Sequence, residues 1–248
     1  MKTLGIIPAR YGSSRLEGKP LMDIAGKPMI QCVFEQAKKQ LEYVLVATDD
    51  ERIFKVVKEF GGNVVMTSLQ HTTGTNRCLE AYDIFWIENK MDFDVIINIQ
   101  GDEPLLDPEQ IRLILTCFED KQTEMATLVI PVEENESLEN GVFVVFDKFK
   151  NALYFSRSVI PFVRDAAKSE WPKKHTFYRH LGMYAFKPAA LRTFASLAQT
   201  SLELAESLEQ NRWLENGKKI KVALTTIETQ AVDTLEDLEK VRRIISKE

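Results

Sequence analysis

Short apolar runs alternate with helical patterns through the first half of the chain. The runs have the length and composition of buried strands, and they lie at residues 4–7, 43–47, 63–66 and 94–99. The segments between them place apolar side chains at helical spacing, over residues 28–40, 50–60 and 75–90. Strands that alternate with helices predict a mostly parallel sheet with helices on both faces, which is an α/β fold.

The second half of the chain is less regular. We expect its strands at residues 125–132, 142–146, 152–155, 181–186 and 220–227. An amphipathic pattern over residues 202–215 predicts one helix, which ends before Gly217, and residues 234–246 predict a closing helix. Without a linker or repeat, the pattern predicts a single domain over residues 1–248, with an inserted polar arm at about 133–178.

Three helix starts can be predicted from capping residues. Asp107 followed by Pro108 is typical of an N-cap and a first helical position. Thr48 with Glu51, and Thr234 with Asp237, have capping-box spacing. These pairs explain several acidic side chains without any catalytic role.

Composition removes several classes of protein. The chain has 248 residues, a net charge of −5 and 44% hydrophobic residues, which excludes wholesale disorder and a fibrous repeat. Its three cysteines are far apart and form no C-x-x-C pair, so neither a disulfide framework nor a cysteine-rich zinc site is expected. No apolar stretch approaches the ~18 residues of a membrane span. We therefore expect a cytoplasmic protein with no nucleic-acid or membrane partner.

A basic loop follows the first predicted strand. It contains Arg10, Arg15 and Lys19 against the single acid Glu17, together with a run of glycine and serine. Ligands of open α/β sheets bind beyond the carboxyl ends of strands, so this loop is placed to bind an anion such as polyphosphate. The loop is not a Walker loop, and G-x-G-x-x-G occurs nowhere in the chain. On charge alone, a solvated basic loop fits as well.

Acidic residues follow two later strands. Asp102 and Glu103 come after the most apolar strand, where a carboxylate can hold Mg²⁺ against phosphate oxygens. A turn leading into the next helix is the alternative. Asp233 precedes the Thr234 cap without being part of it, and is therefore available as a second ligand. The three histidines form no H-E-x-x-H or Ser/His/Asp pattern, so a nucleophile triad is not indicated.

Seven sequence blocks in order resemble a known family. They are I-I-P-A-R-Y-G-S-S-R-L-E-G-K-P-L, A-T-D-D-E-R-I, G-G-N-V-V-M-T, N-I-Q-G-D-E-P, A-L-Y-F-S-R-S-V-I-P, R-H-L-G-M-Y and V-D-T. Together they cover nearly the whole chain, and they resemble the 3-deoxy-manno-octulosonate cytidylyltransferase (CMP-Kdo synthetase) family. The resemblance implies the nucleotide-diphospho-sugar transferase fold, a three-layer α/β/α sandwich with a mostly parallel mixed sheet. It also implies transfer of CMP from CTP to the sugar acid 3-deoxy-D-manno-octulosonate (Kdo) for lipopolysaccharide biosynthesis, with Mg²⁺, by a homodimer that the arm helps to form.

The same resemblance implies a role for particular residues. The residues expected to bind the nucleotide are Ala9, Arg10, Ser13, Arg15, Lys19, Thr73, Gly74, Thr75 and Arg77. Asp102 and Asp233 are expected to ligate Mg²⁺ and, with Arg10 and Lys19, to carry catalysis. The residues expected to contact the sugar acid are Gln100, Arg157, His180, Tyr184, Glu209 and Gln210. Arg157 is the best candidate for the sugar carboxylate, because a guanidinium can bind a carboxylate through two hydrogen bonds.

Three alternatives remain open at this point. A related sugar acid, such as 8-amino-Kdo or a sialic acid, would need the same residue types. A non-catalytic nucleotide-sugar binding protein could share the fold, although it would have little need for paired metal carboxylates. A redox enzyme is disfavoured by the missing glycine fingerprint.

Overall fold

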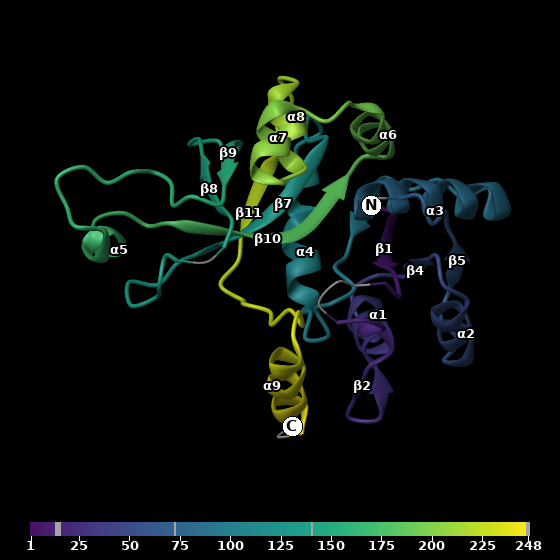
Figure 1. Ribbon diagram of the computed structural model, residues 1–248. Helices are drawn as coiled ribbons and strands as arrows, with labels where there is room; N and C mark the ends of the chain where they lie inside the picture. Colours follow the sequence, from purple (N-terminus) through teal and green to yellow (C-terminus); the bar gives the residue numbers. More distant parts are fainter. Residues whose placement is uncertain (13–15, 72, 140, 247–248) are drawn as a thin grey trace. The chain divides into compact units, whose positions relative to one another are not determined.

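The computed structural model describes residues 1–12, 16–71, 73–139 and 141–246 (Figure 1). The chain divides into two compact units. The first comprises Met1–Arg112, Lys187–Ala195 and Thr229–Glu248, and the second comprises Leu113–Phe186 and Ser196–Glu228. The predicted arm at about 133–178 lies wholly within the second unit. Among the described residues, no helix is both long and apolar enough to cross a membrane.

Parallel strands form the centre of the first unit. They are β1 (Thr3–Ala9), β4 (Tyr43–Thr48), β5 (Val64–Met66) and β6 (Val95–Asn98). The spatial order is β6-β1-β4-β5, and each adjacent pair is parallel. Almost every residue of these strands is buried, which is why they occur in the sequence as continuous apolar runs. Their carboxyl ends meet at one edge of the sheet.

Helices cover both faces of this sheet. They are α1 (Met29–Lys38), α2 (Glu51–Glu59) and α3 (Gly74–Asn89). Helices α1 and α2 connect β1 to β4 and β4 to β5, in one direction across the sheet. Helix α3 connects β5 to β6, which lies on the other side of β1. Right-handed crossovers then place α3 on the opposite face from α1 and α2, as Figure 1 shows. The predicted arrangement of helix, sheet and helix layers is confirmed for this unit.

Two of the predicted caps are correct and one is wrong. Thr234 caps α9 (Leu235–Ile245) in a capping box with Asp237, and Asp107 accepts a hydrogen bond from the Glu109 amide as α4 (Pro108–Thr116) begins. For α2, however, the N-cap is Asp50, whose carboxylate accepts from the Arg52 amide at 2.9 Å. Thr48 cannot be the cap because it is still part of β4, paired with Met66 of β5.

Short elements complete the first unit. The 3₁₀ turn η1 (Lys19–Leu21) and the small pair β2 (Asp23–Ile24) and β3 (Lys27–Pro28) lie between β1 and α1. Helix α6 (Pro188–Ser196), which the sequence pattern did not predict, packs beside α3. There the Arg192 guanidinium lies over the ring of Tyr82 and donates to Asp83 at 3.1 Å.

The second unit contains a mixed group of strands. They are β7 (Met125–Pro131), β8 (Phe143–Phe146), β9 (Ala152–Ser156), β10 (Tyr178–Phe186) and β11 (Lys221–Leu224). β7 lies between β11, which is parallel to it, and β10, which is antiparallel. β8 joins β10 to β9. β10 begins three residues before its predicted start, and β11 is shorter than predicted.

The helix predicted over residues 202–215 is wrong as a single element. The structure has α7 (Ser201–Glu206) and α8 (Gln210–Glu215), separated by Ser207 in the left-handed conformation at φ 52°. A left-handed residue ends a helix, so the chain turns between the two segments. The amphipathic pattern continues through the break because both helices bury one face. Gly217 at φ 70° follows α8 as predicted.

The arm has an apolar interior of its own. It includes η3 (Lys168–Glu170) and α5 (Trp171–Lys174), and the Trp171 and Phe177 side chains are buried with Val132, Leu138 and Phe143. Trp171 and Phe177 therefore belong to the core of their own unit.

Candidate active site

The loop after β1 is closed by its own backbone. The Gly18 amide donates to the Tyr11 carbonyl at 2.9 Å, and Gly18 has a left-handed φ of 68°. A Cβ at Gly18 would lie 3.0 Å from the Tyr11 ring. The Arg52 guanidinium stacks on the same ring, 3.3 Å from its centroid. No motif or spacing in the sequence indicates this contact between Tyr11 and Arg52. Ala9 is buried at the end of β1 and Arg10 is exposed, whereas Ser13 and Arg15 lie outside the described residues.

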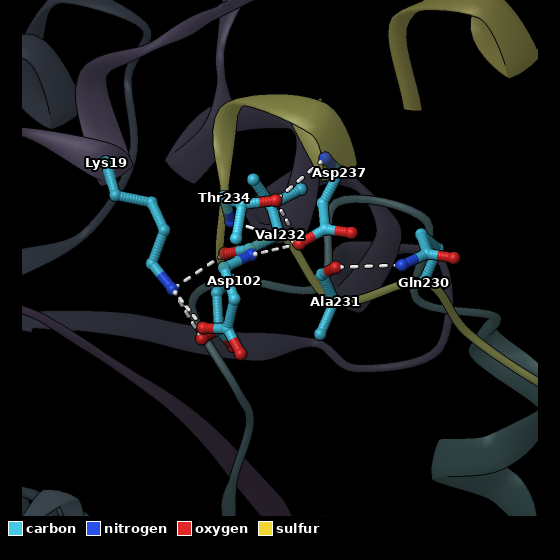
Figure 2. Close-up of polar contacts among 8 residues, drawn as sticks. Lys19, Asp102, Gln230, Ala231, Val232, Thr234 and Asp237 are labelled. Atoms are coloured by element: carbon cyan, nitrogen blue, oxygen red, sulfur yellow. Dashed lines mark hydrogen bonds and ion pairs between the residues drawn. The ribbon is translucent and has the colours of Figure 1, made fainter. Parts of the chain in front are cut away.

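Lys19 is the central cation of the first unit's candidate site (Figure 2). Its ammonium group donates to Asp102 Oδ2 at 2.8 Å, to Asp233 Oδ1 at 3.3 Å and to the Val232 carbonyl at 2.8 Å. Its side chain is only 14% exposed, so these interactions are partly shielded from water. Pro20, the second residue of η1, restricts the backbone where the ammonium group emerges.

Backbone contacts bring the two acidic segments together. The Val232 amide donates to the Asp102 carbonyl at 2.9 Å, and the Val232 side chain is buried among Leu16, Met29 and Leu238. Gly101 lets the turn after β6 pass close to the end of β1, because a Cβ there would lie 2.7 Å from the Pro8 carbonyl oxygen. Asp102 and Asp233, far apart in the sequence, therefore present their carboxylates to one ammonium nitrogen.

This donor set fits a magnesium ion that a substrate helps to hold. Mg²⁺ is typically bound by one or two carboxylates, with phosphate oxygens and water as the remaining ligands. Asp102 and Asp233 supply two carboxylates. Across the described ranges, no group of three or more histidine, cysteine or acidic side chains could hold a metal alone. That Asp102 and Asp233 bind Mg²⁺ stays a prediction.

Glu103 lies next to these carboxylates but faces a different partner. It accepts a hydrogen bond from the Thr229 hydroxyl at 2.8 Å, and burial raises its pKa to about 7. The sequence placed Glu103 beside Asp102 at the sheet edge. It gave no sign of the burial, because Thr229 is distant in the chain.

The candidate nucleotide residues on α3 lie at the start of that helix. Thr73 is the N-cap and accepts from the Asn76 amide, and Thr75 is fully buried. A Cβ at Gly74 would lie 3.5 Å from Pro8 and 3.6 Å from Asn98, so the helix begins over the ends of β1 and β6. A helix N-terminus there carries the positive end of the helix dipole.

Arg77 has a structural task in this unit. Its guanidinium is buried and donates to Asp49 Oδ2 and to Thr67 Oγ1, both at 2.6 Å. It thereby connects α3 to the segments that follow β4 and β5. Its expected role toward the nucleotide stays a prediction.

In the second unit, the candidate sugar residues on β10 face one way. The His180 and Tyr184 rings lie 5.2 Å apart, although a bulge interrupts the pairing with β7 between them. The bulge adds two residues to β10, and an even number preserves the alternation of side chains. Both side chains therefore lie on one face of β10.

Hydrogen bonds orient both rings. The Thr127 hydroxyl donates to the Met183 carbonyl at 2.7 Å, so it accepts from His180 Nε2 at 2.8 Å. Burial lowers the pKa of His180 to about 3, so the imidazole is neutral at neutral pH. The Tyr184 hydroxyl donates to Gln210 Oε1 at 2.9 Å. The amide nitrogen of Gln210 is buried without a hydrogen-bond partner in the described part of the chain, which leaves a donor for a ligand.

The remaining candidates lie at element ends. Arg157 directly follows β9 and is exposed, and its Nε donates to the Glu206 carbonyl at 2.7 Å. Glu209 precedes α8 and contributes to raising the pKa of Tyr184, for which burial is the main cause. Gln100 follows β6, two residues before Asp102. Gln100 belongs to the first unit, and the other candidate sugar residues belong to the second.

Comparisons with known proteins identify the family. The family profile described as cytidylyltransferase matches residues 4–220. A 3-deoxy-manno-octulosonate cytidylyltransferase of Parabacteroides distasonis is 54% identical, over 97% of this chain and 96% of its own. One from Bacteroides thetaiotaomicron is 51% identical, over 99% of this chain and 98% of its own.

A solved structure agrees with these sequences. CMP:2-keto-3-deoxy-manno-octonic acid synthetase, in complex with CTP, is 39% identical and aligns with a TM-score of 0.89 over 100% of this chain and 99% of that one. This likeness confirms the nucleotide-diphospho-sugar transferase fold that the sequence blocks implied. The chain belongs to the cytidylyltransferase family, among the 3-deoxy-manno-octulosonate cytidylyltransferases.

Proposed function

We propose that this chain transfers CMP from CTP to Kdo and releases pyrophosphate, as a step of lipopolysaccharide biosynthesis in the cytoplasm. Full-length similarity to 3-deoxy-manno-octulosonate cytidylyltransferases supports the pair of substrates. The observation that carries the proposal is the meeting of Lys19, Asp102 and Asp233 at one point. A cation between two carboxylates, beside a basic loop, suits a site that manages the charge of a triphosphate.

Charge is the main obstacle to this reaction. CTP carries about four negative charges and the sugar acid one, and two like charges 4 Å apart repel by about 4 kcal/mol at an effective dielectric of 20. Arg10 and Lys19 neutralise part of this charge. When bound between Asp102 and Asp233, Mg²⁺ would neutralise more of it as a Lewis acid.

The chemistry itself asks little of the protein. The anomeric hydroxyl oxygen of the sugar acid forms a bond to the α-phosphorus as the bond to pyrophosphate breaks, and the hydroxyl proton passes to water. Positioning and charge neutralisation carry such phosphoryl transfers. This agrees with the absence of a nucleophile triad from the sequence. Sugar hydroxyls can be bound by the neutral imidazole of His180 and by the hydrogen-bonded pair of the Tyr184 phenol and the Gln210 amide. The carboxylate of the sugar acid can be bound by Arg157.

Pyrophosphate release tests this proposal directly. Purified protein with CTP, Mg²⁺ and Kdo is expected to release pyrophosphate, whereas 8-amino-Kdo and sialic acid are expected to be poorer substrates. A higher kcat/KM for either of these acids would favour the alternative sugar. Turnover with none of the three would favour a non-catalytic nucleotide-sugar binding protein.

Arg157→Ala is expected to raise the KM for Kdo at least about tenfold and to change the KM for CTP little, because a charge-assisted hydrogen bond to the carboxylate is lost. Arg157→Lys should not restore the KM fully, because an ammonium group cannot replace the planar fork. Arg164→Ala, which removes an arginine that is 89% exposed and pairs with Asp165, is the control. Equal effects on both substrates, or none, would contradict the carboxylate role.

We also propose that the protein is a homodimer. The arm exposes Phe162, which is 76% accessible and packs edge-on against Trp171, and such a side chain suits an interface. Light scattering at micromolar concentration is expected to give twice the 28.4 kDa mass of the chain. A mass of 28.4 kDa would refute the dimer.

A further inference from the structure

We infer that Glu206 is a positioning residue for sugar-acid recognition. It holds two features in place: Arg157, and the turn that carries Glu209 and Gln210. The inference deepens the proposed function and rests on it. Glu206 is the last residue of α7, and the sequence did not single it out.

The Glu206 carboxylate accepts hydrogen bonds from three donors in β9 and directly after it. Oε1 accepts from the Ser156 hydroxyl at 2.6 Å and from the Tyr154 hydroxyl at 3.2 Å, and Oε2 accepts from the Arg157 amide at 2.9 Å. The bond from Ser156 is the main cause that lowers the pKa of Glu206, so the group is ionised at neutral pH. Hydrogen bonds to an ionised acceptor are about twice as strong as neutral ones.

Glu206 also determines how Arg157 can meet a ligand. The Glu206 carbonyl accepts from Arg157 Nε at 2.7 Å, and the Ser207 carbonyl lies 3.4 Å from Nη2. These bonds occupy one edge of the guanidinium and place its charge at the negative end of α7. Nη1 has no acceptor in the described part of the chain. It lies on the side of the guanidinium opposite the edge that Nε and Nη2 form, so it remains available to a ligand. A carboxylate would therefore be bound end-on, through Nη1 and the second hydrogen of Nη2.

The same residue precedes the turn to the other candidate sugar residues. Ser207 at φ 52° follows Glu206 directly, and the chain then passes through Glu209 to Gln210, which accepts from the Tyr184 hydroxyl. Asn211 adds a second connection to β9, because its amide donates to the Phe155 carbonyl at 3.0 Å. Glu206 is thus the point at which the end of β9 and the turn between α7 and α8 are held in register.

The test is Glu206→Gln, which keeps the size of the side chain but replaces one accepting oxygen with a donor. The amide oxygen can still accept and the new donor can face a hydroxyl, but the negative charge that strengthens the three bonds is lost, so the end of β9 and Arg157 with it are held less firmly. We expect the KM for Kdo to rise about tenfold, while the KM for CTP stays within about twofold. An unchanged KM for Kdo, or equal rises for both substrates, would overturn the inference.

The chain offers a matched control in the same pair of helices. Glu215 at the end of α8 accepts from the Ser201 hydroxyl at 2.9 Å and from the Leu202 amide at 3.0 Å, and it makes no contact with Arg157. Glu215→Gln therefore removes a carboxylate with a similar number of bonds and should leave the KM for Kdo unchanged. If both variants raise this KM alike, Glu206 acts only through the stability of the helix pair.

A double variant separates positioning from packing. If Glu206 acts partly through Arg157, Glu206→Gln should raise the KM for Kdo by a smaller factor once Arg157→Ala is present, whereas fully additive effects would overturn the inference. Should Glu206→Gln fail to fold, Tyr154→Phe removes one bond to Oε1 and is expected to raise the KM for Kdo about twofold. An unchanged KM in that variant would then count against the inference.

Calorimetric titration with Kdo distinguishes this inference from the proposed function. Wild-type protein that binds Kdo without turnover would contradict the proposed reaction alone, and weaker binding by Glu206→Gln would still support the inference. Wild-type protein that neither binds Kdo nor turns it over would overturn both.

Discussion

Asp102→Asn is expected to lower kcat by a hundredfold or more, roughly the several kcal/mol that a bound metal contributes to transition-state charge stabilisation. The amide keeps the size of the side chain but removes the negative charge that faces Lys19 at 2.8 Å and is proposed to ligate Mg²⁺. The Asp102 backbone carbonyl would still accept from the Val232 amide, so the fold should persist. Steady-state kinetics with varied Mg²⁺, together with circular dichroism, measure both expectations.

Asp107→Asn is the matched control for this variant. Asp107 lies in the segment between β6 and α4, and its carboxylate caps α4 by accepting from the Glu109 amide. Asparagine is about as good an N-cap as aspartate, so both stability and turnover should change little. Near-normal turnover of Asp102→Asn, or an equal loss in both variants, would contradict the metal assignment.

The regular part of the fold could be predicted because its signal is local. The strands β1, β4, β5 and β6 are buried on both faces, so their sequences are continuous apolar runs of strand length. The break at Ser207 could not be predicted in this way. It depends on bonds from β9 to Glu206, about fifty residues earlier in the chain, and the apolar period continues across it.

The candidate site shows the same division. Lys19, Asp102 and Asp233 each follow a recognisable strand or precede a recognisable cap, so their neighbourhood could be anticipated from the topology. Their common contact at one ammonium group could not, because it depends on the backbone bond between Val232 and Asp102. The partners of Arg77 could not be predicted for the same reason, since Asp49 and Thr67 lie in the segments that follow β4 and β5.

Lys19→Met should slow turnover about a hundredfold and should also change how the protein responds to Mg²⁺. Without the ammonium group, Asp102 and Asp233 face each other with no cation between them, and two like charges 4 Å apart repel by about 4 kcal/mol at an effective dielectric of 20. The variant should therefore unfold at a lower temperature in the absence of metal. A divalent ion can replace the lost cation, and binding to the folded state alone stabilises it.

The decisive measurement is the rise in Tm on addition of Mg²⁺, followed without any substrate. In the wild type the ion must compete with Lys19 for the two carboxylates, so the rise should be small. In Lys19→Met that competitor is absent, and each kcal/mol of additional binding should raise Tm by about 2–4 °C for a chain of this size. Lys27→Met, which removes a lysine that is half exposed and paired with Glu35, should behave like the wild type. Equal Mg²⁺ responses in Lys19→Met and the wild type would show that Lys19 and the metal do not share the Asp102 and Asp233 carboxylates, and the proposed magnesium site would be lost with them.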